Sequence, residues 1–178
     1  MAICCLTEPE TIKMTTNWIV GMIILATVGS GLMSGLFFTF SNFAMQAFGE
    51  LPPNYGSAAM QSVNVRIINP QFLTVFLGTA IISLISVVFA GLNWEQPGSA
   101  WILAGGLLYL GGCMFITIRF NIPLNDQLAT LDPEGPGIIP RWQAYAASWL
   151  PWNHVRTFST LAATAAFAVS LTKFNPCS

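Results

Sequence analysis

Charged residues are scarce in this sequence. Only 7% of its 178 residues are charged, whereas 54% are hydrophobic. Soluble domains carry roughly 25% charged residues, because a surface in contact with water needs them. The chain is therefore not an ordinary soluble globule, and we expect an integral membrane protein whose main partner is the lipid bilayer. Its net charge is -1, so the basic surface that binds nucleic acid is missing.

Residues that bind metals and cofactors are equally few. His154 is the only histidine, and the four cysteines form no C-x-x-C pair. A haem held by two histidines or a di-iron centre needs more ligands than these. The stretch Gly29-Ser30-Gly31 lies in an apolar run and does not complete a nucleotide-binding motif. The sequence therefore predicts no metal site and no bound cofactor.

Charge-free stretches predict where the chain crosses the membrane. An unpaired charge at the bilayer centre costs at least ~2.5 kcal/mol, and a spanning helix needs about 20 apolar residues. The apolar runs predict helices at about residues 18–43, 70–92, 100–118 and 152–171. None of them shows the alternation of a β-barrel strand. We therefore predict an all-α fold, an integral membrane four-helix bundle that forms a single domain over residues 1–178.

Small residues within these runs predict close contact between helices. They are Gly31, Gly35, Gly78, Gly105, Gly106, Gly111 and Gly112. Residues 1–17 are interpreted as an N-terminal extension. Because Met14 stands directly before the first span, we also expect Met14 to be the native start.

Four crossings place both termini on one face of the membrane and two long connections on the other. We expect these connections to be loops at residues 47–69 and 120–150, punctuated by proline and glycine. Four arginines lie on the long-loop side, against two lysines on the side of the termini. The positive-inside rule therefore favours cytoplasmic long loops, unless the arginines serve a functional site.

Polar residues gather at the long-loop end of all four predicted helices. The set comprises Ser41, Asn42, Asn64, Arg66, Asn69, Arg119, Asn121, Asn125, Asp126, Trp149, Trp152, Asn153, His154, Arg156 and Thr157. Such clustering predicts a cavity close to that membrane interface. At about 100° per residue, Asn153, Thr157, Thr160 and Thr164 form one stripe on the last helix, with Arg156 at its edge. The threonines can be explained by hydrogen bonds between helices, whereas an arginine within a span is a functional candidate.

Two of these side chains have a plain interpretation beside a catalytic one. Asp126 lies two helical turns from Arg119 and can form a structural ion pair with it. The same carboxylate can also act on a ligand. His154 can be a general base near neutral pH, or simply a hydrogen-bonding residue at the start of a helix.

Two clusters of these residues resemble a known family. They are Asn121-x-x-x-Asn125-Asp126-x-Leu128 and Trp149-x-x-Trp152-Asn153-x-x-Arg156-Thr157. Together with Asn69-Pro70 and the four spans, they are similar to the anthrone oxygenase-like membrane proteins. The resemblance covers about residues 18–173. It implies a four-helix membrane protein whose relatives oxidise anthrones to anthraquinones with molecular oxygen and neither metal nor flavin.

The resemblance also implies roles for individual residues. Oxygenation without a cofactor needs a base that removes a carbon-bound proton and donors that stabilise the resulting oxyanion. We expect His154 or Asp126 to be the base and Asn125, Asn153 and Arg156 to be donors. Trp149 and Trp152 would stack on a lipophilic aromatic ligand, and Asn69, Asn121 and Thr157 would complete the polar wall.

A second interpretation assumes the same pocket but no catalysed reaction. The protein would then be a non-catalytic membrane protein that binds a lipophilic small molecule, as a carrier or an accessory subunit. A channel or an ion-coupled transporter is disfavoured, because no charged relay passes through the middle of the predicted spans.

Overall fold

The computed structural model describes residues 10–173, and this part of the chain consists of helices joined by short turns. The helices are α1 (Glu10–Thr39), η2 (Phe40–Ala44), α2 (Met45–Glu50), α3 (Pro53–Arg66), α4 (Pro70–Leu92), α5 (Ser99–Leu107), η3 (Leu108–Phe115), η4 (Thr117–Asn121), α6 (Ile122–Ala129) and α7 (Ile138–Lys173). The η elements are π-helical turns inside longer helices. No strand is found among the described residues, so the predicted all-α class is confirmed.

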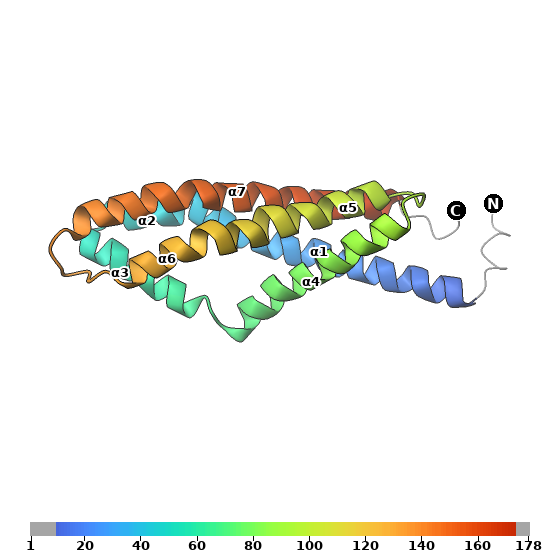
Figure 1. The fold of residues 1–178 in the computed structure, drawn as a ribbon, viewed down its shortest axis with the longest axis horizontal. Helices are drawn as coiled ribbons and strands as arrows, with labels where there is room; N and C mark the ends of the chain where they lie inside the picture. The colour runs from blue at the N-terminus through green and yellow to red at the C-terminus, as the bar shows by residue number, and fades with distance from the viewer. Residues whose placement is uncertain (1–9, 174–178) are drawn as a thin grey trace.

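Four helical stretches are long and apolar enough to cross a membrane. They are Asn17–Glu50, Pro70–Leu92, Ser99–Ala129 and Ile138–Lys173. Figure 1 shows them side by side in one elongated bundle, with α2, α3 and α6 gathered at one end and the α4–α5 turn at the other. We call these the α3 end and the turn end. The predicted multi-pass membrane bundle is confirmed in this coarse form.

The structure contradicts the two expected long loops, because most residues of both segments are helical. Residues 47–69 hold the end of α2 and all of α3, and residues 120–150 hold α6 and the first third of α7. Hydropathy reports where a helix leaves the membrane and not where it ends, so polar helical extensions were mistaken for loops. Pro52, Pro133 and Pro136 do lie in the turns between these helices, whereas Pro53 occupies the first turn of α3.

Helix boundaries shift for the same reason. α7 begins at Ile138 instead of residue 152, and the third helix continues from Ser99 to Ala129 instead of stopping at 118. α1 begins at Glu10, within the expected extension 1–17, of which residues 1–9 lie outside the described part. With 36 residues, α7 is ~54 Å long against a hydrocarbon core of about 30 Å. The bundle therefore extends well beyond the membrane.

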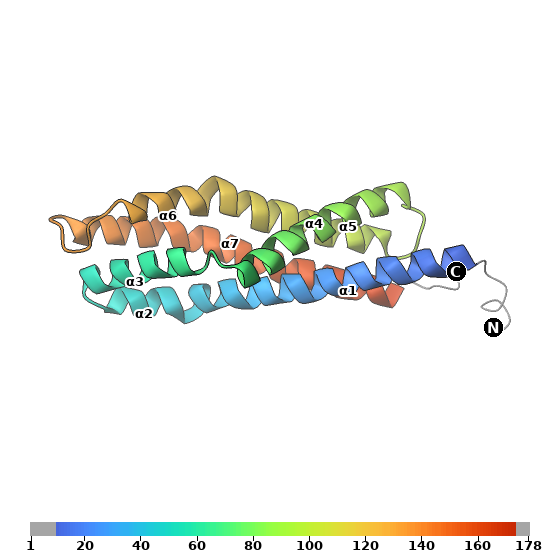
Figure 2. The ribbon, with the colours of Figure 1, turned by 90° about the horizontal axis from the view of Figure 1, so that it is seen from below.

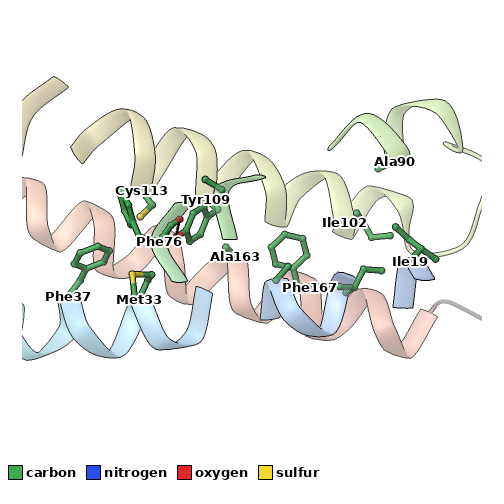
Figure 3. Packing of buried hydrophobic residues seen from close by; sticks show 13 residues of the cluster. Ile19, Met33, Phe37, Phe76, Ala90, Ile102, Tyr109, Cys113, Ala163 and Phe167 are labelled. Carbon is green, nitrogen blue, oxygen red and sulfur yellow. Dashed lines mark hydrogen bonds between the residues drawn. The ribbon is translucent and has the colours of Figure 1, made fainter. Parts of the chain in front are cut away.

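Two clusters of buried side chains hold the helices together. The first, the membrane cluster, includes Ile23, Phe76, Tyr109, Cys113 and Phe167 and runs along the spans (Figure 3). The second, the outer cluster, lies at the α3 end and consists of Met45, Met60, Leu128, Trp142, Tyr145 and Trp149. Because lipid tails are as apolar as these side chains, contact between helices in the membrane depends on close packing.

Some of the predicted small residues provide that packing. A Cβ added at Gly106 would meet Val87 Cγ2 at 2.5 Å and the Ser83 carbonyl oxygen at 2.9 Å, so α4 and α5 touch through their backbones. At Gly105 it would meet the Phe167 ring at 2.9 Å. Gly35, Gly78 and Gly111 have open space instead, so the predicted close contact does not occur there.

Candidate functional site

A cavity of about 350 Å³ lies where the helices meet near the α3 end. Side chains from α1, η2, α3, α4, η3, η4, α6 and α7 line it. Its wall is apolar except at five residues, which are Asn64, Thr117, Asn125, Trp149 and Arg156. The volume falls at the lower end of the range of about 300–1,000 Å³ typical of small-molecule pockets.

Among the described residues that line this cavity, Arg156 is the one that is charged. Its side chain is only 6% exposed and projects from a membrane-spanning helix. Nη2 donates to Asn153 Oδ1 at 2.7 Å, Nη1 donates to Thr117 Oγ1 at 3.4 Å, and Nε has no partner. The guanidinium lies over the Phe37 ring at 4.3 Å and the Trp149 ring at 5.2 Å. No carboxylate of the described residues forms an ion pair with it.

A buried charge of this kind needs an explanation. Taking an ion out of water costs several kcal/mol, and proteins normally compensate with a partner of opposite charge. Two aromatic faces and one amide oxygen compensate only in part, since a cation–π contact is worth about 0.5–2 kcal/mol and a charged hydrogen bond about 1.5–3 kcal/mol. The arrangement therefore leaves one positive group, with a free donor, in the wall of an apolar cavity.

Asn153 holds this arginine in place. Its Nδ2 donates to the Phe37 carbonyl and to Ser41 Oγ, both at 2.8 Å, while its Oδ1 accepts from Arg156. Asn153 is fully buried and does not line the cavity. We expected it to donate to a ligand, but both of its donors are used within the protein. It acts as a positioning residue for Arg156.

A π-helical turn brings the partners of Asn153 together. η2 interrupts the first span at Phe40–Ala44 and contains Ser41. The Ser41 hydroxyl hydrogen-bonds Thr157 Oγ1 at 2.9 Å, and the Thr157 hydroxyl also donates to the Asn153 carbonyl at 2.9 Å. Such π-bulges are frequent at functional sites, because they turn a helix face toward new partners.

The remaining polar lining residues add unpartnered donors. Asn64 Nδ2 and Trp149 Nε1 are buried without a hydrogen-bond partner, as is Arg156 Nε. Asn125 Oδ1 accepts the Tyr145 hydroxyl at 3.0 Å. Buried polar atoms are almost always satisfied in folded proteins. All three donors belong to residues that line the cavity, and the donor atoms themselves are covered by protein.

Several of the predicted site residues lie elsewhere. Asn69 caps α4, accepting from the Phe72 amide at 3.0 Å and donating to the Arg66 carbonyl at 3.0 Å. Asn121 is buried and donates to the Trp149 carbonyl at 3.4 Å, so it joins η4 to α7. Trp152 stacks on Phe120, with ring centroids 3.7 Å apart. None of the three lines the cavity.

The two candidate bases are also outside the cavity lining. Asp126 is exposed on α6, and His154 is half-buried on α7. The alternative ion pair between Asp126 and Arg119 is not formed either, because the Arg119 guanidinium lies over the Phe120 ring at 5.5 Å. The described part of the chain holds no group of three or more His, Cys, Asp or Glu side chains close together.

The stripe on α7 serves mainly to pack the helix. Thr160 and Thr164 donate to carbonyls of their own helix, and the Thr164 hydroxyl also donates to Ser30 Oγ at 3.0 Å. The expected hydrogen bond between helices is therefore made by Thr164, whereas the hydroxyl of Thr160 bonds only within α7. Three residues at or beside the cavity, Asn64, Thr117 and Tyr145, were not among the predicted site residues. Asn64 belongs to the polar set at the long-loop end and could have been included, whereas no sequence pattern pointed to Thr117 or Tyr145.

Comparison with known proteins agrees with this geometry. The sequence model of the anthrone oxygenase family matches residues 71–166, which is more than half of the chain. The chain belongs to the anthrone oxygenase family. The matched segment of the chain contains Asn125, Trp149 and Arg156, the polar side of the cavity formed by α6 and α7. No curated protein and no solved structure matches the chain.

Proposed function

We propose that this protein is a membrane-embedded oxidoreductase that oxidises a lipophilic phenol or anthrone with molecular oxygen and without a metal. The observation that carries the proposal is the position of Arg156. A buried guanidinium without a carboxylate partner in the described residues forms part of an otherwise apolar cavity wall. Membership of the anthrone oxygenase family supports the same class of substrate.

The chemistry explains why a lone arginine is useful. An anthrone reduces oxygen directly only after a carbon-bound proton has left and its carbonyl has become an enolate. That negative charge is expensive in an apolar cavity. A donor already fixed at the place where the charge develops stabilises the transition state at no reorganisation cost. Arg156, held by Asn153 at 2.7 Å, fits this role.

The overall reaction balances without another reductant. The methylene carbon of the anthrone loses two hydrogens and gains one oxygen atom as a new carbonyl. The second oxygen atom leaves as water with those hydrogens. The substrate supplies all the electrons, so the protein has to provide orientation, stabilisation of the enolate and exclusion of bulk water.

The mechanism also needs a group that accepts the carbon-bound proton. We retain His154 and Asp126 as the candidate bases, although neither lines the cavity. A proton taken by either of them would travel through a relay. The positive charge of Arg156 favours ionisation of the bound substrate and so reduces the strength of base that is needed.

The test is oxygen uptake by purified protein in liposomes that contain anthrone, with metal chelated. We expect uptake above that of protein-free liposomes and formation of anthraquinone. Arg156→Met should abolish the excess. Arg119→Met is the matched control, because it removes an exposed arginine outside the cavity. Equal uptake by Arg156→Met and the wild type would refute the proposal.

The non-catalytic alternative has one observation in its favour. No carboxylate or imidazole is among the residues that line the cavity. A carrier or accessory subunit would bind the same molecules and needs no base. Binding of anthrone without oxygen uptake above the protein-free control would support this alternative.

We also propose that the α3 end faces the cytoplasm, on the positive-inside rule. Gln143 is exposed near the start of α7 and suits a cysteine-labelling test. In a background with Cys4, Cys5 and Cys177 replaced by Ser, Gln143→Cys should react with an impermeant maleimide in inverted vesicles. Reaction with the maleimide in intact cells would instead show that the α3 end faces the outside.

A further inference from the structure

We propose that the cavity is filled sideways from the bilayer, through an opening between α4 and the η4–α6 helix. The occupant is a lipid-dissolved weak acid, a phenol or an enolisable ketone, that is neutral on arrival and places its oxygen at Arg156. This inference rests on the proposed function only in taking the cavity as a ligand site. The opening itself is a property of the described helices.

Side chains at the rim identify the opening. Four aliphatic residues that line the cavity are at the same time exposed on the outside of the molecule. They are Ile68 at 69%, Leu77 at 44%, Ile118 at 59% and Ile122 at 43% exposed. Two of them precede or belong to α4, and the others belong to η4 and α6. A side chain that faces both a cavity and the outside stands at the mouth of that cavity.

The path of α4 explains why these helices separate. α4 packs against α1, α5 and η3, whereas η4 and α6 pack against α7 and α3. Between α3 and α4 the backbone becomes extended at Asn69, with φ -128° and ψ 160°, directly before Pro70. Figure 1 shows the resulting corner projecting from the bundle, and Figure 2 shows the same bundle turned by 90°. The beginning of α4 therefore diverges from α6 while its end remains packed.

The mouth lies at membrane depth. α4 has 23 residues and is ~35 Å long, slightly more than the hydrocarbon core. Leu77 is seven residues into this helix, so it lies ~10 Å from its start and within the hydrocarbon. Exposure of large aliphatic side chains around an opening is unfavourable in water but costs nothing among lipid tails.

A second pocket of about 330 Å³ lies between α6 and α7 at the α3 end, but it shares no lining residue with the cavity. Toward the α3 end the outer cluster closes the cavity, with Trp142, Tyr145 and Trp149 following one another at centroid distances of 5.7 and 6.4 Å. Toward the turn end Phe76 and Tyr109 belong to the membrane cluster, and the Tyr109 hydroxyl donates to the Phe76 carbonyl at 3.0 Å. The side between α4 and α6 remains.

The wall chemistry defines the occupant. Its polar side chains, among them Arg156, Asn64 and Trp149, suit an occupant that offers acceptor oxygens. An ion does not reach them through lipid, because a charge in the bilayer is costly. A weak acid crosses as a neutral molecule and ionises beside the guanidinium. A permanently charged molecule of the same size could fit the cavity but does not reach it, because it would have to cross the lipid.

Site-directed spin labelling tests the opening independently of any ligand. In a background with Cys4, Cys5 and Cys177 replaced by Ser, a nitroxide is attached at Leu77→Cys or Ile118→Cys in liposomes. Leu107→Cys serves as the lipid-facing reference and Gln143→Cys as the reference at the α3 end. Labels at the mouth should collide with oxygen like the Leu107 label. Collision with a water-soluble nickel chelate like that of the Gln143 label would overturn the proposal.

Binding kinetics test the route. Anthrone in liposomes under argon is the probe, and quenching of tryptophan fluorescence reports its binding. Ile118→Trp narrows the mouth and should slow both association and dissociation, on the order of tenfold. Leu107→Trp, on the lipid-facing side of α5, should leave both rates unchanged. Rates for Ile118→Trp equal to those of the wild type would overturn the route. Failure of anthrone to bind the wild type would instead count against the proposed function, while the spin-label result still decides the opening.

Discussion

Replacing Arg156 by Met separates the two roles that a buried arginine can have. In a structural role the guanidinium stabilises the fold, and in a ligand-binding role it is held ready at a cost in stability. Met keeps much of the length and apolar volume of the stem. The substitution removes the hydrogen bond to Asn153 Oδ1 at 2.7 Å and the contacts with the Phe37 and Trp149 rings.

The contributions to stability nearly cancel. The charged hydrogen bond is worth about 1.5–3 kcal/mol and the aromatic contacts about 0.5–2 kcal/mol. Against this stands the desolvation of a guanidinium that is 6% exposed and has no carboxylate partner in the described residues, a penalty of several kcal/mol. We expect the free energy of unfolding to change by less than about 2 kcal/mol in either direction.

The effect on the ligand should be large in comparison. An anionic oxygen that loses a charge-assisted hydrogen bond loses about 1.5–3 kcal/mol, which raises Kd about 10- to 100-fold. The assay combines thermal unfolding in detergent with binding of anthrone under argon. A variant that unfolds far more easily but binds anthrone as the wild type does would refute the reasoning, because Arg156 would then be structural.

The other predictions concern positioning, packing and the base. Asn153→Asp should place a carboxylate beside the guanidinium and neutralise it, so anthrone binding should weaken although the protein folds; unchanged binding would remove the positioning role. Gly106→Ala should force α4 away from α5 and lower the free energy of unfolding by about 1–3 kcal/mol, whereas Gly111→Ala, with open space around it, should not destabilise the protein. If the two variants unfold at the same temperature, the close backbone contact between α4 and α5 at Gly106 is contradicted. His154→Gln and Asp126→Asn should leave the Kd for anthrone unchanged, because neither side chain lines the cavity. A loss of oxidation rate at constant Kd would identify the base, and a raised Kd would place the residue in the binding site.

The spans were predictable because charges are so rare that long charge-free runs indicate the membrane segments. The helical extensions were not, since a polar helix beyond the membrane has the composition of a loop. α3 illustrates this, because its residues 53–66 include Asn54, Gly56 and Gln61 and yet form four turns of helix. Gln61 contributes to packing by donating to the Leu128 and Leu131 carbonyls.

The candidate site was predictable to the level of residue type. Scarcity of charge drew attention to Arg156, and the structure places Arg156, Trp149 and Asn125 at one cavity. The direction of each side chain depends on tertiary contacts that no local pattern contains. Asn153 lies less than one helical turn from Arg156 on α7. The Asn153 side chain nevertheless bonds the Phe37 carbonyl, whereas the Arg156 side chain lines the cavity. The π-helical turn η2 that makes this possible left no recognisable signal in Phe40–Ala44.

The most direct test of the central claim follows the oxygen atoms. Purified wild-type protein in liposomes, treated with a chelator, is supplied with anthrone and isotopically labelled molecular oxygen. The proposed function predicts anthraquinone with one labelled carbonyl, formed faster than in protein-free liposomes and lost in Arg156→Met. Anthrone that binds at the cavity yet is oxidised no faster than in protein-free liposomes would contradict it.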